Sequence, residues 1–203
     1  MSQPFQRQCT VPAPRQPDER LHEWWVDNPW KIVANGKSLS GFERNRVFLN
    51  DDGDRFFEIS AITGADSQGD GRGVVATDFN GDGRQDLIVR QAGGGPVLLF
   101  ENRFAQAHWL RLSLRGTKSN RMGLGARIEA VSGKHRVIRE LYPKGGFKAQ
   151  GSSSVHIGLA KHKQLDRLTV TWPSGLKQEW LEVEADQHLL LVEGQSEPQR
   201  FNR

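Results

Sequence analysis

The stretch Asp78-Phe-Asn-Gly-Asp-Gly-Arg-Gln-Asp86 decides how the first half of this chain is interpreted. Oxygen-bearing side chains recur at every second position of the stretch, and Gly83 then turns the backbone. Calcium takes several oxygen ligands in flexible geometry, and one short loop of this kind supplies them. The sequence therefore predicts a Ca²⁺ site. The predicted ligands are the side chains of Asp78, Asn80, Asp82 and Asp86 and the backbone carbonyl of Arg84.

The segments on either side of this loop distinguish it from an EF-hand. An EF-hand loop needs a bidentate Glu at its twelfth position and a helix on each side. Here the twelfth position is Val89, and the flanking segments 74–77 and 87–89 read as strands. The loop is therefore predicted to connect a β-hairpin. The alternative is an acidic turn that binds nothing, but carboxylates that converge without a cation repel one another, which favours calcium.

Composition favours a β-rich protein and excludes several other classes. The 203 residues include 22 glycines and 9 prolines, which punctuate short elements. No apolar run approaches the roughly 20 residues that span a membrane, so we expect no membrane insertion. Residues 1–21 have no apolar core of the signal-peptide type, so none is expected in this chain. The single cysteine, Cys9, excludes an intrachain disulfide.

The net charge of +4 raises the question of nucleic-acid binding. A nucleic-acid site gathers Lys and Arg on one face or stripe. In this chain acidic residues lie between the basic ones, and the basic residues between Arg111 and Lys148 follow alternating strand patterns. We therefore expect no nucleic-acid partner.

From His108 onward the sequence becomes a series of short alternating segments. In the first of them Leu110, Leu112 and Leu114 share one face. Turn signals separate the segments at roughly 10–15 residues, a spacing typical of a β-sandwich or barrel. The later segments of this kind are 126–131, 135–141, 155–159, 167–172 and 184–193. The predicted core residues are Leu112, Ile128, Ile157, Leu168 and Val170.

These patterns predict an all-β chain, in which a calcium-loop hairpin packs with a C-terminal antiparallel β-sandwich or barrel. A hairpin is also expected around the turn at 50–54, and a short helix is allowed at 178–183. The predicted division is a lead-in at 1–20, an aromatic segment with the calcium hairpin at 21–104, a β domain at 105–196 and a tail at 197–203.

Several separated motifs resemble a known family. The segment Gly116-Thr-Lys-Ser-Asn-Arg-Met-Gly-Leu-Gly-Ala-Arg127 is similar to the central motif of the ASPIC/UnbV domain. Segments 145–151, 155–159 and 168–175 resemble later elements of that domain. The acidic hairpin is similar to an FG-GAP-type repeat, the calcium-loop blade of integrin-like β-propellers. One such repeat followed by ASPIC/UnbV resembles the cartilage acidic protein-like family.

The resemblance implies a recognition or adhesion module at the cell envelope or outside the cell. Its calcium would be structural, no reaction would be turned over, and the partner would be a protein or a glycan. Relatives carry several blades, whereas this chain has one clear calcium loop, which implies a partial propeller blade. A homo-oligomer or a larger assembly is therefore expected.

The alternative hypothesis is a small calcium-containing enzyme that acts on a natural product or a carbohydrate. Its acid–base groups would be Glu140, Tyr142 and His156 around a cleft. No HExxH motif, Gly-x-Ser-x-Gly elbow or phosphate loop occurs in the sequence, which favours recognition over catalysis. A cleft in which two titratable groups converge would favour the enzyme, and a flat surface around His156 would favour recognition.

Overall fold

The computed structural model describes residues 20, 43–51, 53–91, 96–143, 145–147 and 149–201. This part of the chain forms thirteen strands and one short helix, which confirms the all-β class. None of its helices is long and apolar enough to cross a membrane. Except for residue 20, the predicted lead-in and the aromatic segment up to residue 42 lie outside the described residues. The chain divides into two compact units, 1–71 with 91–96 and 72–90 with 97–203.

The first unit contains the hairpin predicted around residues 50–54. Strands β1 (Phe48–Asp51) and β2 (Arg55–Glu58) pair antiparallel, and the Asn50 side chain accepts a hydrogen bond from the Gly53 N–H at 2.8 Å. A single helical turn, α1 (Ser60–Thr63), follows β2. The Ser60 hydroxyl accepts a hydrogen bond from the Val47 N–H at 2.7 Å, which fixes α1 to the start of the hairpin.

The second unit contains the acidic hairpin. Strands β3 (Gly71–Thr77), β4 (Asp86–Gln91) and β5 (Leu98–Phe100) form a three-stranded sheet in the order β3-β4-β5. The loop at 78–85 connects β3 to β4, as the sequence predicted. β4 and β5 pair antiparallel, with Ile88 opposite Leu99.

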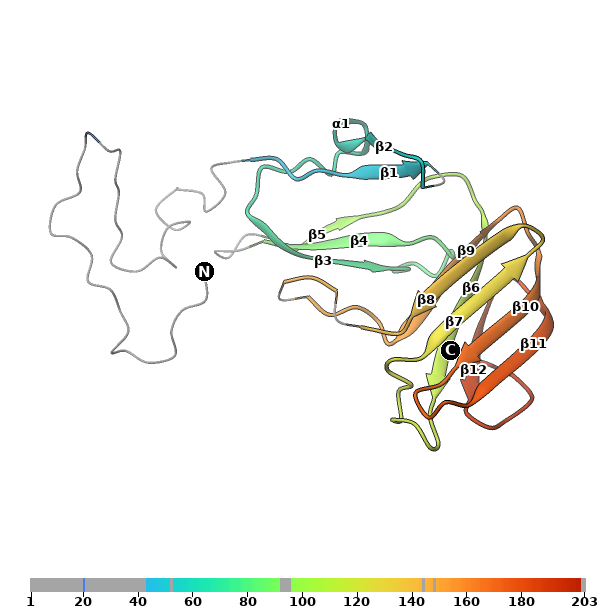
Figure 1. Cartoon of the computed structure of the whole chain (residues 1–203). Coiled ribbons are helices and arrows are strands. Elements are labelled where there is room, and N and C mark those ends of the chain that lie inside the picture. The colour runs from blue at the N-terminus through green and yellow to red at the C-terminus, as the bar shows by residue number, and fades with distance from the viewer. Residues whose placement is uncertain are drawn as a thin grey trace, which may run out of the picture. The chain divides into compact units, whose positions relative to one another are not determined.

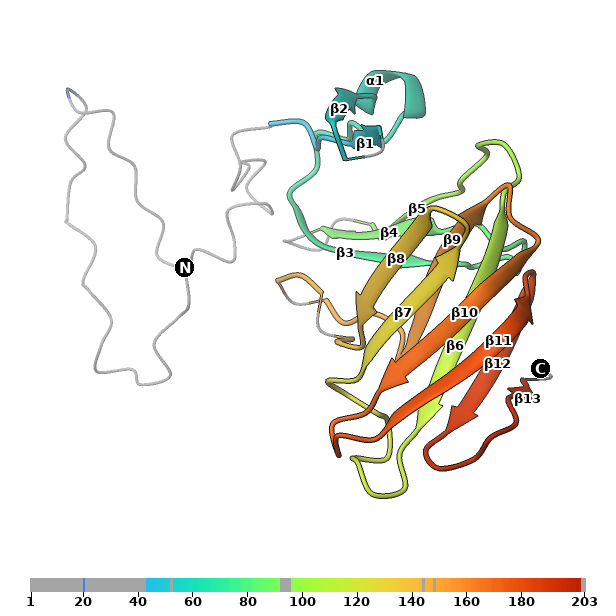
Figure 2. The same ribbon diagram turned by 45° about the vertical axis from the view of Figure 1, so that its right-hand side comes forward.

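The rest of the second unit is a β-sandwich of two four-stranded sheets, which Figures 1 and 2 show as two layers. One sheet has the order β11-β10-β7-β8, and all its pairs are antiparallel. The other has the order β13-β12-β6-β9, in which β12 runs parallel to β6. The strands of the first sheet are β7 (Arg127–Ser132), β8 (His135–Glu140), β10 (Gln164–Thr171) and β11 (Lys177–Glu184). Those of the second are β6 (His108–Arg115), β9 (Ser154–Ala160), β12 (Gln187–Val192) and β13 (Gln199–Arg200).

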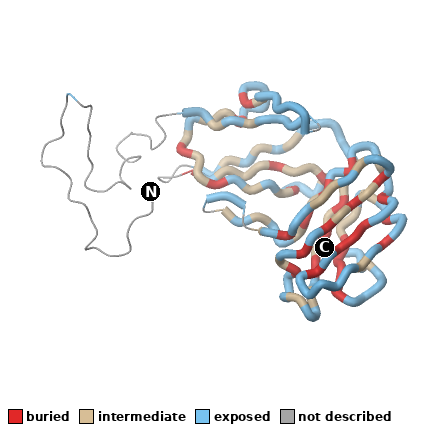
Figure 3. The backbone as a smooth tube through the Cα atoms, in the orientation of Figure 1, coloured by how far each residue is buried: buried red, intermediate tan, exposed pale blue. Residues whose placement is uncertain are grey.

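The core lies between these two sheets, where Figure 3 shows most of the buried backbone. Alternation along β6 turns three leucines inward, as predicted, and the facing strands contribute branched aliphatic side chains. The five predicted core residues are all buried, which confirms the strand registers. They are Leu112, Ile128, Ile157, Leu168 and Val170.

The prediction that a short helix is possible at 178–183 is wrong, because this segment belongs to strand β11. Its buried side chains, Trp180 and Val183, are three residues apart, which imitates a helical period. The spacing arises because Glu182 has a positive φ of 54°, which interrupts the alternation of faces. β11 nevertheless keeps its register with β10, pairing Leu181 with Arg167.

Candidate functional site

The acidic loop carries two buried carboxylates. Asp78 is 6% exposed and Asp86 is 1% exposed. The two oxygens of Asp78 accept hydrogen bonds from the backbone N–H groups of Gly81, at 2.7 Å, and Gly83, at 3.1 Å. Asp86 accepts a hydrogen bond from the Phe79 N–H at 2.9 Å. These bonds hold both carboxylates over the backbone of the loop.

The other predicted ligands bond to one another. Asp82 forms an ion pair with Arg84, whose side chain is 25% exposed. Asp82 also accepts a hydrogen bond from the Asn80 side-chain amide at 2.9 Å, and its own N–H donates to Asn80 Oδ1 at 3.1 Å. The side-chain hydrogen bond from Arg84 is the largest cause that lowers the pKa of Asp82. Asp82 is therefore charged, and its carboxylate is already paired with the Arg84 guanidinium.

The donor chemistry of the loop fits Ca²⁺. Every predicted ligand offers oxygen, the donor that hard cations prefer. The loop contains three carboxylates and one guanidinium, which gives it a formal charge of −2 that a divalent cation would balance. No three His, Cys, Asp or Glu side chains converge as a metal cluster in the described part of the chain. Calcium binding would therefore require Asp82 to exchange Arg84 for the cation.

A glycine in the loop packs on an indole ring of the sandwich. Gly83 has a φ of +87°, and a Cβ built on it would lie 1.9 Å from Nε1 of Trp109 on β6. Only glycine allows this approach with this backbone conformation. The Trp109 ring stacks in turn on His156 of β9, with ring centroids 6.0 Å apart.

Hydrogen bonds fix the same loop to the segment that leads into β6. The Asn102 N–H donates to Asp86 Oδ1 at 2.8 Å. The Gln106 side-chain amide donates to the Asp82 carbonyl at 3.0 Å. The loop is therefore docked on the sandwich through both its backbone and a buried carboxylate.

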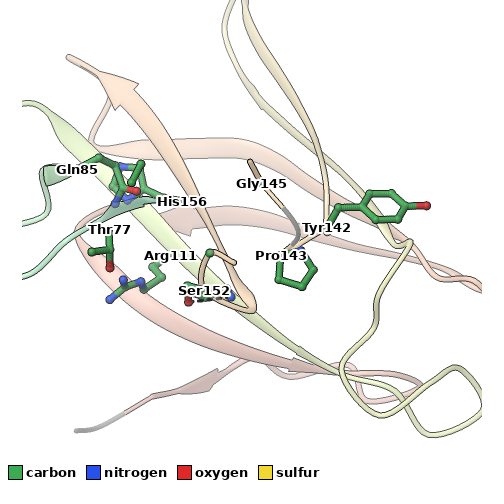
Figure 4. A pocket seen from close by; sticks show the side chains of 11 residues that line it. Thr77, Gln85, Arg111, Tyr142, Pro143, Gly145, Ser152 and His156 are labelled. Atoms are coloured by element: carbon green, nitrogen blue, oxygen red, sulfur yellow. Dashed lines mark hydrogen bonds between the residues drawn. The ribbon is translucent and has the colours of Figure 1, made fainter. Parts of the chain in front are cut away.

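His156 lines a cavity of about 170 Å³ rather than a flat surface. Figure 4 shows side chains from the acidic hairpin and from the sandwich around it. Its polar lining residues are Thr77, Gln85, Arg111, Ser152, Ser154 and His156, and Tyr142 and Pro143 complete one edge. Arg111 on β6 pairs directly opposite His156 on β9. Burial and the nearby positive charge of Arg111 lower the pKa of His156 below its usual value.

The structure does not bring the three candidate catalytic residues together. Glu140 ends β8 on the exposed surface and is absent from the residues that line this cavity. Tyr142 lies at the cavity edge, but its ring points away from His156 in Figure 4 and its side chain is exposed. Among the described residues, no hydrogen bond joins the His156 ring to an acid.

Sequence reasoning missed a buried carboxylate at the other end of the sandwich. Glu193 is 3% exposed. One of its oxygens accepts hydrogen bonds from three consecutive backbone N–H groups, each at 2.7 Å. These donors are Thr117, Lys118 and Ser119. Its other oxygen accepts from the hydroxyls of Ser119, at 2.9 Å, and Ser174.

These contacts determine the protonation state of Glu193. Burial favours the neutral acid and would raise the pKa, but the hydrogen bonds from Ser174 and from the loop at 117–119 outweigh it. They lower the pKa of Glu193 from 4.5 to about 2. Thr117-Lys-Ser119 and Trp172-Pro-Ser174 both belong to the motifs of the family resemblance. Both segments are turns rich in hydrogen-bond donors, and this was the sequence feature that could have indicated a buried acceptor such as Glu193.

Comparison with known proteins supports the resemblance stated from the motifs. Residues 32–89 match the family model of the FG-GAP-like repeat, and residues 116–198 match that of ASPIC and UnbV. Cartilage acidic protein 1 of Xenopus tropicalis is 31% identical over 159 residues, which cover 73% of this chain and 24% of the relative. The Homo sapiens protein of the same name is also 31% identical over 159 residues, or 23% of its length.

The chain spans about a quarter of the length of the curated relatives it matches. The order of the two matched regions is the one that the motifs indicated. The chain thus joins an FG-GAP-like repeat to an ASPIC and UnbV region and is homologous to a part of cartilage acidic protein 1.

Proposed function

We propose that this chain is a calcium-binding recognition module of the adhesion type, exposed at the cell envelope or outside the cell. The observation that carries the proposal is the docked acidic loop, whose excess of negative charge lies directly against the sandwich. Calcium in this loop would be structural, because its ligands all come from one short segment that positions the hairpin. Recognition without turnover is the function that we propose for this module.

The partner is proposed to be a protein or a glycan, in a homo-oligomer or a larger assembly. Exposed apolar side chains outside the sandwich support this proposal. Phe48, Phe56 and Phe57 are exposed in the first unit, and Val74 and Leu99 are exposed on the sheet β3-β4-β5. Exposed apolar side chains that cluster mark interaction surfaces. An FG-GAP-like repeat would cover such side chains with a neighbouring blade or a second chain.

Calcium should raise the melting temperature of the protein, because a ligand that binds only the folded state stabilises it. At a free calcium concentration about a hundred times the dissociation constant, the gain is roughly 2.7 kcal/mol. Thermal denaturation with calcium and with chelator measures it. A melting temperature that is indifferent to both would contradict the calcium site.

Asp82→Ala should abolish the calcium gain and change the stability of the calcium-free protein little. Asp82 is partly exposed, and its present partner is Arg84 rather than a buried group. Asp54→Ala is the matched control, since Asp54 lies in the other acidic, glycine-containing turn and is exposed. The control should keep the full gain. Magnesium should substitute poorly in the wild type, because it demands a tighter octahedron and dehydrates reluctantly.

The cavity at His156 is the one observation that favours the enzymatic alternative, a small calcium-containing enzyme for a natural product or a carbohydrate. Acid–base catalysis needs two groups that exchange protons near the operating pH. Glu140 does not line the cavity, and the Tyr142 ring points away from His156. Recognition is therefore better supported. A turnover that disappears in His156→Gln would favour the enzyme instead.

A further inference from the structure

The cavity beside the docked loop is the right size for one small polar molecule. Its volume of about 170 Å³ exceeds the ~30 Å³ that one water molecule occupies in the liquid. It is smaller than the ~300 Å³ at which pockets for drug-sized ligands begin. The cavity therefore suits a small molecule or a single residue of a longer ligand.

Two donors at this cavity lack an acceptor. The side-chain nitrogen of Gln85 is buried and has no hydrogen-bond partner. Arg111 forms no hydrogen bond or ion pair with any residue that the structure describes. Buried polar groups in native proteins are almost always hydrogen-bonded, so the unpaired Gln85 amide indicates a missing acceptor. The half-buried Arg111 guanidinium lines the same cavity and can donate to that acceptor. A guanidinium fork matches the two oxygens of a carboxylate.

The charge around the cavity selects a singly charged acid. Arg111 supplies one full positive charge, whereas His156 is held neutral at neutral pH by burial and by Arg111. The Asp78 carboxylate acts on His156 from the neighbouring loop and adds negative charge on that side. Arg139 also acts on His156 with a positive charge, so Arg111 and Arg139 exceed Asp78 by one positive charge. A monoanionic carboxylate balances this excess, whereas a phosphate dianion would retain an unpaired charge.

The remaining lining groups suit a ligand with hydroxyls of its own. Thr77, Ser152 and Ser154 offer hydroxyls, and those of Ser152 and Ser154 lie 2.7 Å apart. A hydroxyl both donates and accepts, so these groups can use both the donors and the acceptors of sugar hydroxyls, whereas an ionised acidic side chain offers them acceptors only. We propose that this cavity binds a sugar acid of the uronic acid class, with its carboxylate on Arg111 and the Gln85 amide. The assignment extends the proposed recognition function by naming a ligand, and it rests on that proposal.

Titration of the whole chain with sodium glucuronate, followed by calorimetry or by NMR of the His156 ring, tests the assignment. Arg111→Gln should weaken binding by about tenfold to a hundredfold, the usual effect of removing a charged hydrogen-bond partner. Arg115→Gln is the matched control on the same strand, since Arg115 is exposed and lies outside this cavity. The control should bind like the wild type. No binding by the wild type, or equal binding by Arg111→Gln, would overturn the proposal.

Gln85→Met supplies a second variant that does not depend on how Arg111→Gln folds. It removes an amide nitrogen that has no partner, so the melting temperature should not fall. Affinity for glucuronate should nevertheless decrease several-fold. An unchanged affinity would remove Gln85 from the site and contradict the proposed acceptor.

Three further probes test the chemistry of the ligand. Glucose lacks the carboxylate and inorganic phosphate carries the wrong charge, so both should bind at least about tenfold more weakly. Binding of N-acetylglutamate as tight as that of glucuronate would overturn the sugar assignment in favour of an acidic peptide.

Titrations with calcium and with chelator separate the two proposals. Glucuronate binding that survives when calcium has no effect refutes only the calcium site, and the reverse result refutes only this cavity.

Discussion

The sandwich and the acidic hairpin are stabilised by different forces. Between the sheets of the sandwich, leucine, isoleucine and valine side chains are almost fully buried. In the hairpin the buried positions are instead glycine, acidic or amide residues, among them Gly83, Asp78 and Asp86. Several apolar side chains of its sheet, such as Val74 and Leu99, face solvent.

This difference determines what each region responds to. Apolar burial is non-directional and hardly depends on ions, so the sandwich should respond to the loss of core volume. Directional hydrogen bonds around carboxylates depend on charge and on close contacts, so the hairpin should respond to cations and to local steric changes. Substitutions that act on one region and spare the other test this contrast.

Leu168→Ala should have the largest effect, because it empties part of the sandwich core. Leu168 is fully buried on β10, and buried leucines truncated to alanine cost about 2–5 kcal/mol. Leu181→Ala on the adjacent strand is the matched control, since Leu181 is 66% exposed. It should change the free energy of unfolding by less than about 0.5 kcal/mol. Chemical denaturation measures the free energy of unfolding of both variants. Equal decreases in the two variants would show that Leu168 of β10 does not contribute to the core.

The sandwich could be predicted from sequence because its signal is local and repeated. Alternation along β6 and along the strands that face it reveals which side chains point inward. The acidic loop was placed for a similar reason, since its spacing lies within nine residues. The one strand that was interpreted as helical, β11, contains the positive φ at Glu182, a backbone feature that no periodicity reveals.

Features that depend on distant residues could not be predicted in the same way. Glu193 bonds to donors at 117–119, more than seventy positions away, and the donor-rich turn alone does not show which acceptor it meets. The cavity likewise combines Gln85 from the hairpin with Arg111 from β6. Such sites depend on how strands pair across the fold, which the sequence of each strand does not encode.

Glu193→Gln should destabilise the sandwich less than Leu168→Ala, because glutamine keeps one oxygen that accepts hydrogen bonds. It loses the charge and places an amide N–H₂ group against backbone donors at 117–119. Thermal denaturation near neutral pH should show a lower melting temperature for this variant. Glu197→Gln is the control, since Glu197 is exposed a few residues further on.

The deficit of Glu193→Gln should depend on pH in a defined window. The folded pKa of Glu193, about 2, lies below its ordinary value of 4.5. A carboxyl whose folded pKa is depressed contributes its full stability above the unfolded pKa and loses it as the pH falls through the folded value. The difference between wild type and variant should therefore be complete above pH 4.5 and shrink toward pH 2. A difference that is constant across this range would show that the charge of Glu193 contributes nothing.

Gly83→Ala should have the smallest effect on global unfolding, because it acts on the hairpin alone. An added Cβ would overlap the Trp109 ring, so the loop must move away from β6. Gly175→Ala is the control that measures backbone strain without a steric clash. Gly175 has a φ of +89°, close to the +87° of Gly83, but nothing lies within 4 Å of a Cβ added to Gly175. Strain alone costs about 1–2 kcal/mol at either position.

Hydrogen exchange localises the consequence of this substitution. In Gly83→Ala the amides of the acidic loop, including the Gly83 donor to Asp78 and the Asn102 donor to Asp86, should exchange faster than in the wild type. The amides of β10 should keep their protection, because the sandwich core does not depend on the hairpin. Faster exchange in both regions would show that hairpin and sandwich unfold together, and unchanged exchange in both would show that Gly83 does not dock the loop on Trp109.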